Sequence, residues 1–151
     1  MTANIDPIYS RAGDVQGVEI TAGNTKSDGS GTIGTDIFQA AQVDTNNGGF
    51  VQAVEFWPTA TANATATTAT VGRVFISSQA NANTSTSAAN THPVGEVSLA
   101  SQTADSSTNP VFPVVVPINR ALPPGYTVLV TNHVIPATNT KWKAVVRMGK
   151  Y

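Results

Sequence analysis

The sequence of 151 residues contains no cysteine, and only 11% of its residues are charged. Without cysteine the chain has no disulfide bonds, no thiolate nucleophile and no zinc site built on Cys ligands. Its eight Lys and Arg residues are scattered, and the formal net charge is −1. A nucleic-acid-binding surface needs clustered cations, so we expect no nucleic-acid partner.

Long apolar runs are also missing. No uncharged apolar segment approaches the roughly 20 residues of a membrane-spanning helix. The N-terminal segment MTANIDPIYSRAG has no apolar stretch and carries Asp6, unlike a secretory signal. These features predict a soluble protein made in a cytoplasm, without a membrane partner. The nearest approach to a cationic cluster is typical of a solvated strand face: Lys141, Lys143, Arg147 and Lys150.

Short neutral residues dominate instead. Thr, Ala, Asn and Ser supply 64 of the 151 residues, and they form two tracts without any charge, residues 59–70 (TATANATATTAT) and 77–91 (SSQANANTSTSAANT). Threonine favours strands, so we expect the first tract to extend a hairpin, whereas the second reads as a loop. A surface of neutral hydrogen-bonding groups favours contact with other proteins over chemical catalysis.

Apolar residues alternate with polar ones from residue 18 onward. Residues 50–57 (FVQAVEFW), 71–77 (VGRVFIS) and 142–148 (WKAVVRM) are examples, and Gly, Pro and Asn separate such segments. Period two indicates strands, and seven or eight strands without crossover helices predict an all-β fold, an antiparallel β-sandwich that is jelly-roll-like. Residues 18–151 form this domain and residues 1–17 an extended arm; residues 36–43 fit a helix or a strand.

Two glycine-containing segments imitate ligand-binding motifs. Residues 29–34 (GSGTIG) match G-x-G-x-x-G, but a polar segment precedes them and no βαβ alternation follows, which favours a loop. Residues 44–55 (DTNNGGFVQAVE) place Asp44 and Glu55 at the ends of a calcium loop. The same residues also predict a hairpin, because Asn and Gly tolerate the positive φ of a tight turn. We favour the hairpin.

No catalytic constellation is present. His92 and His133 are 41 residues apart without an H-E-x-x-H motif, and no G-x-S-x-G elbow occurs. We therefore predict no enzyme activity, no cofactor and no metal. Trp142 lies in an alternating segment and is expected in the core, whereas Trp57 precedes Pro58 at a predicted strand end, a position suited to a binding surface.

Residues 121–131 (ALPPGYTVLVT), a Trp-bearing strand ending in residues 147–151 (RMGKY), and residues 71–76 (VGRVFI) after a Thr/Ala tract resemble small β-sandwich head decoration, or cement, proteins of tailed bacteriophages. The resemblance implies a structural virion protein on the capsid exterior, made in the host cytoplasm. It implies binding to the major capsid protein and a homo-oligomer, a trimer with a dimer as the alternative. It implies no catalytic residues.

On this reading the partner-binding residues are apolar anchors: Ile5, Ile8 and Tyr9 on the arm, and Trp57 on the domain. The alternative is a carbohydrate- or receptor-binding β-sandwich module of a phage tail fibre, which would use Trp57 and loop asparagines. The two readings differ in whether the partner is a protein lattice or a sugar.

Overall fold

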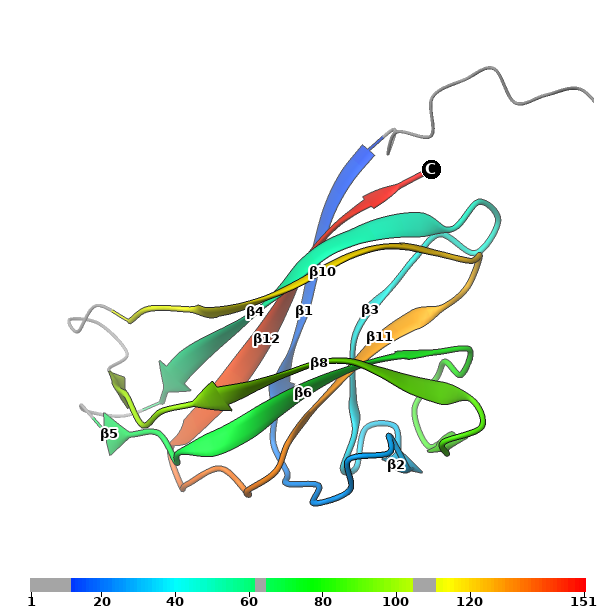
Figure 1. Cartoon of the computed structure of the whole chain (residues 1–151). Helices are drawn as coiled ribbons and strands as arrows, with labels where there is room; N and C mark the ends of the chain where they lie inside the picture. The colour runs from blue at the N-terminus through cyan, green and yellow to red at the C-terminus, as the bar shows by residue number, and fades with distance from the viewer. Residues whose placement is uncertain (1–11, 62–64, 105–110) are drawn as a thin grey trace, which may run out of the picture.

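The computed structural model describes residues 12–61, 65–104 and 111–151, and these contain strands and turns but no helix. Two four-stranded antiparallel sheets pack face to face (Figure 1). The first sheet has the order β1 (Ala12–Ile20), β12 (Thr140–Lys150), β4 (Gly49–Ala60), β10 (Val114–Leu122). The second has the order β3 (Phe38–Gln42), β11 (Thr127–Asn132), β6 (Thr70–Ser77), β8 (Thr91–Leu99). The predicted antiparallel β-sandwich is confirmed.

Strand pairing is nested along the chain. β1 pairs with β12, β3 with β11, β4 with β10, and β6 with β8. The start of β1 and the end of β12 therefore lie side by side, as the blue and red strands in Figure 1 show. A long hairpin that is rolled up produces such nesting; the jelly-roll-like connectivity expected from the sequence stays a prediction.

The main core lies between the sheets because alternate residues of each strand face inward. Its largest members are fully buried and include Ile20, Phe56, Leu99 and Trp142. Gly72 permits Phe56 and Leu99 to approach β6, since an added Cβ would lie within 3.0 Å of both side chains. Trp142 donates from Nε1 to the carbonyl oxygen of Thr68 at 3.3 Å, which satisfies its polar group inside the core.

A second, smaller core covers the outer side of the second sheet. Ile33 and Ile37 pack there on Phe75 and Leu129. The covering segment contains β2 (Gly31–Thr32), which pairs with β7 (Ser85–Thr86) from the second neutral tract. The G-x-G-x-x-G segment, predicted as a loop, therefore contains the short strand β2 and packs on the sheet.

The two sheets also meet along their edges. The side-chain amide of Gln16 on β1 bonds the main chain of Gln42 on β3 in both directions: Nε2 donates to the Gln42 carbonyl at 3.1 Å, and Oε1 accepts from the Gln42 amide at 3.1 Å. At the opposite edge Val116 of β10 packs on Gly95 of β8, where an added Cβ would lie 2.5 Å from the valine side chain.

The structure decides three assignments that the sequence left open or placed differently. Residues 12–17, which we assigned to the arm, belong to β1 and pair with β12, so the predicted arm boundary at residue 17 is wrong. Residues 36–43 contain a strand, β3. The first neutral tract continues β4 to Ala60, and its later part, β5 (Thr65–Ala66), pairs with β9 (Thr103–Ala104).

Candidate interaction surface

The side of the first sheet that faces away from the core forms the candidate surface, which we call the outer face. Strand register places its residues in rows across the sheet, because paired residues share a face. One row consists of Val15, Arg147, Ala53 and Pro117; the next of Gly17, Val145, Glu55 and Val115; and a third of Glu19, Lys143 and Trp57. Neighbouring rows are about 6.6 Å apart, the rise of two strand residues.

Glu55 is the centre of a polar cluster on this face. Its Oε1 accepts a hydrogen bond within an ion pair from Arg147 Nε at 2.8 Å, and its Oε2 accepts from Trp57 Nε1 at 3.0 Å. The Glu55 side chain is only 15% exposed, so the arginine and the indole hold a largely shielded carboxylate. Trp57 is half-buried, and its one polar atom is already bonded within the protein.

Aliphatic side chains surround this cluster. Val15 is 67% exposed and Val115 is 44% exposed, and Val145 is half-buried between their strands. Exposed large apolar residues that gather on one sheet face are typical of a surface that contacts another molecule. The outer face therefore combines satisfied charges with uncovered aliphatic groups.

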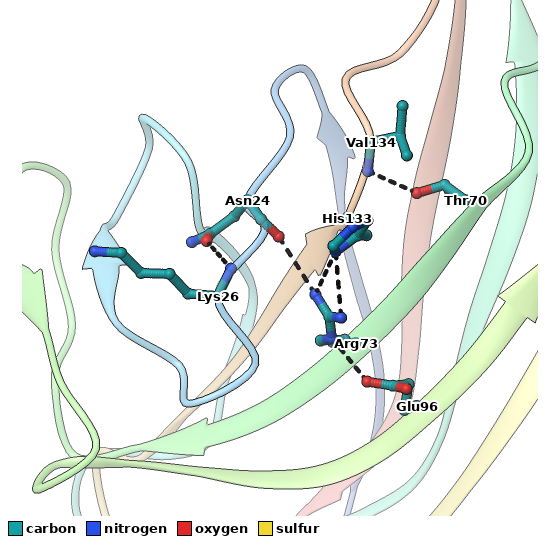
Figure 2. A network of polar contacts seen from close by, with 7 residues as sticks. All are labelled: Asn24, Lys26, Thr70, Arg73, Glu96, His133 and Val134. Carbon is teal, nitrogen blue, oxygen red and sulfur yellow. Dashed lines mark hydrogen bonds and ion pairs between the residues drawn. The ribbon is translucent and has the colours of Figure 1, made fainter.

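A second polar cluster lies on the other sheet, around Arg73 of β6 (Figure 2). Arg73 Nε is 2.7 Å from Glu96 Oε2, Nη1 donates to the Asn24 carbonyl at 3.4 Å, and both Nη atoms lie 3.3 Å from His133 Nδ1. A guanidinium only donates hydrogen bonds, so Nδ1 of His133 is the acceptor. Because the Arg73 side chain is only 11% exposed and its donors are engaged, this cluster fastens two loops to the sheet.

The segment with calcium-loop spacing is a tight turn that carries the chain from β3 in the second sheet to β4 in the first. The predicted turn and the strand after it are confirmed, but the predicted hairpin is wrong, because β3 and β4 pair with other strands and not with each other. Asp44 Oδ1 accepts from the amides of Asn46 and Asn47 at 2.8 and 2.7 Å, Gly48 has a φ of +81°, and β4 starts at Gly49. Those two hydrogen bonds lower the pKa of Asp44, and the one from the Asn47 amide contributes most. Glu55 lies within β4 and bonds Arg147 and Trp57. The carboxylates of Asp44 and Glu55 therefore belong to separate hydrogen-bond clusters.

The candidate residues from the sequence analysis lie in different parts of the structure. Trp57 lies on the outer face, with its indole edge turned to Glu55, and Trp142 is in the core, as expected. Ile5, Ile8 and Tyr9 lie outside the described residues. His92 is exposed, whereas His133 is half-buried against Arg73.

The sequence analysis does not predict that Val15 and Gly17 belong to the outer face, because the alternation it recognises begins at Val18. A signal was present: Val15, Gly17 and Glu19 alternate with Gln16 and Val18 in the period of a strand. The predicted solvated strand face of β12 holds for Lys141, Lys143 and Arg147, which are on the outer face. Lys150, three residues after Arg147, points to the opposite side of β12 and bonds Asp14 instead.

Within residues 12–61, 65–104 and 111–151, no three His, Asp or Glu side chains converge as metal ligands. No helix in the same ranges is long and apolar enough to cross a membrane. Comparison with protein-family models, curated proteins and solved structures finds no match to this chain.

Proposed function

We propose that this chain is a structural protein of a tailed-phage virion, a decoration protein that binds the outside of the head and bridges neighbouring copies of the major capsid protein. One observation carries the proposal: the outer face of the first sheet leaves aliphatic side chains uncovered beside charges that are already paired. The sequence resemblance to cement proteins supplies the identity of the partner.

The composition of the outer face suits attachment to protein. Burying Val15 and Val115 against a partner removes apolar area from water, which is worth about 25 cal/mol per Å². Glu55 and Arg147 already neutralise each other, so a partner covers them at a smaller desolvation cost than lone charges impose. Repetition of a modest contact over many lattice sites, or within a homotrimer or homodimer, then raises the total strength of attachment.

The arm residues Ile5, Ile8 and Tyr9 are proposed as additional anchors. They precede β1, and β1 carries the most exposed valine of the outer face, Val15. Deleting residues 1–11 removes them and leaves every described strand in place, so a loss of head binding in a folded truncated protein supports the anchor role. Full binding by the truncated protein contradicts it.

The decisive experiment is co-sedimentation of the purified chain with empty heads of the phage that encodes it. We expect saturable binding, a higher melting temperature of the heads, and loss of binding in Val115→Asp, whose site is exposed on β10. Ser98→Asp, at an exposed position of β8 in the other sheet, is the matched control.

Absence of binding to heads, together with glycan binding that depends on Trp57, would contradict the proposal and favour the tail-fibre alternative. The structure offers that alternative less support, because the indole N–H of Trp57 bonds Glu55 and its ring is half-buried. A free aromatic platform is the usual requirement for stacking on a sugar.

A further inference from the structure

A hollow interrupts the side-chain layer of the outer face at Gly17. Val15 and Val145 flank it, Gln16 and Lys143 complete its lining, and its volume is about 200 Å³. Glycine is required there by close packing, since an added Cβ would lie 2.7 Å from the carbonyl oxygen of Ala144 on β12. The gap is therefore built into the strand pairing, with main chain as its floor and two valines as its walls.

The charge beside the hollow is uneven. Lys141 bonds Glu19 at 3.2 Å and Arg147 bonds Glu55 at 2.8 Å, whereas Lys143 has no ion-pair partner among the described residues. Glu19 lies opposite Lys143 in the register, but its carboxylate bonds Lys141. Three cations, Lys141, Lys143 and Arg147, thus lie beside two carboxylates, those of Glu19 and Glu55, and the rim of the hollow has an excess positive charge.

Resting on the proposed function, we infer that this hollow receives one aliphatic side chain from an acidic segment of the partner protein, and that a carboxylate of the same segment pairs with Lys143. The size supports a single side chain, because pockets for small molecules usually span about 300–1,000 Å³. An aliphatic anchor in a small pocket with a charged rim is also the usual form of a protein contact.

The geometry sets the spacing of that segment. Val145 and Lys143 are two residues apart on β12 and face the same side, about 6.6 Å from each other along the strand. An extended segment presents its side chains i and i+2 at the same interval. The fitting sequence is therefore an aliphatic residue followed two positions later by Asp or Glu. A nucleic acid fits poorly, since Lys143 is the only cation of this face without an ion-pair partner in the described part of the chain.

The probe is a capped peptide, Ser-Thr-Leu-Thr-Glu-Thr-Ser, titrated into the full chain and followed by amide chemical shifts in NMR spectra. We expect saturable shifts at Gly17, Lys143 and Val145, with millimolar affinity. The same peptide with Gln in place of Glu should bind several-fold more weakly. Shifts at other sites, no shifts at all, or equal binding of the two peptides would overturn the inference.

Charge reversal tests the rim. Lys143→Glu should weaken binding of the Glu peptide about fivefold to tenfold, because an attraction becomes a repulsion. Lys26→Glu makes the same change at an exposed lysine outside the outer face and should bind like the wild type. Equal affinities of the two variants would show that Lys143 takes no part.

Apolar contact is tested at Val15. Val15→Thr keeps the shape and the β-branching but replaces a methyl group with a hydroxyl, which should weaken binding about threefold. Ile135→Thr is the control, because Ile135 is 66% exposed, as Val15 is 67% exposed, yet lies outside the hollow. Unchanged binding in Val15→Thr would place the aliphatic side chain elsewhere.

Head binding separates this inference from the proposed function. If Lys143→Glu and Val15→Thr bind heads as well as wild type does, the hollow is not the contact and the decoration function stands. If wild type binds the Glu peptide at Gly17 but does not bind heads, the hollow recognises an acidic segment of a different protein and the decoration function fails.

Discussion

Replacing Gln16 by alanine should detach the edge of β1 from β3. The Gln16 amide makes two hydrogen bonds to the main chain of Gln42, each 3.1 Å long, and both groups of Gln42 lose their partner in the variant. A typical hydrogen bond contributes about 1 kcal/mol, so the loss should be about 2 kcal/mol in the free energy of unfolding. For a domain of this size that is a fall of about 4–8 °C in melting temperature.

Hydrogen exchange at Gln42 reports the lost contact more directly than the free energy of unfolding does. The amide of Gln42 donates to Oε1 of Gln16, so its hydrogen exchange should become faster in Gln16→Ala, while amides in the middle of β4 keep their protection. Gln52→Ala, the same change at an exposed position of β4, is the control and should leave both quantities unchanged. Unaltered exchange at Gln42, or a stability loss below about 0.5 kcal/mol, would refute the reasoning.

The same contact has a pH signature through Asp14. Its Oδ2 accepts from Gln16 Nε2 at 2.7 Å and from Lys150 Nζ at 3.0 Å. These bonds, that of Gln16 first, hold the pKa of Asp14 below its ordinary value of 3.8. A lowered pKa in the folded state stabilises the fold above the unfolded-state value, and this is lost as the pH falls through the folded-state value. The stability gap between wild type and Gln16→Ala should therefore narrow below pH 3.8, which acid titration followed by circular dichroism measures.

Three further substitutions test other parts of the fold. Arg73→Met removes the contacts to Glu96, Asn24 and His133 and should cost about 2 kcal/mol in urea unfolding; a cost near zero would mean that the loops are held otherwise. Asn132→Leu replaces a fully buried amide without a partner among the described residues and should stabilise the fold by about 1–2 kcal/mol, whereas destabilisation would reveal a bound partner. Asp44→Ala should destabilise the turn between β3 and β4 at neutral pH, because the amides of Asn47 and Asn46 lower the pKa of Asp44, and the difference from wild type should vanish in acid. A difference independent of pH would contradict that explanation.

The β-sandwich could be predicted because period-two alternation is a local property of the chain. For Phe56, Val74 and Trp142, the alternation with adjacent residues in the sequence is enough to indicate which face of the strand is buried. The turn after Asp44 was predictable for the same reason, since consecutive Asn and Gly residues favour a tight turn. That the turn joins two sheets instead of forming a hairpin depends on strand pairing and could not be predicted locally. Such signals need no knowledge of which strand pairs with which.

The outer face could not be predicted, because it depends on register between strands far apart in sequence. Nothing near Glu55 indicates that Arg147 lies beside it, and nothing near Gly17 indicates that its partner is Val145. Gly13 and Gly17 also weaken the strand signal of residues 12–17, and the sequence therefore places this first part of β1 in the arm. The pairing with β12 supplies the stability that the local sequence lacks.

The two faces of β1 have different roles, one in stability and one in the proposed recognition of a partner. Its inward residues Asp14 and Gln16 fasten the strand to β12 and β3, whereas its outward residues Val15 and Gly17 form one side of the hollow. Because successive strand residues point to opposite faces, the contact that fixes Gln16 also fixes the position of Val15 beside Val145. A rigid aliphatic pocket loses little conformational entropy when a partner side chain enters it. The polar inward side of β1 therefore preorganises its apolar outward side, and the proposed recognition site of a chain with few charges depends on strand register.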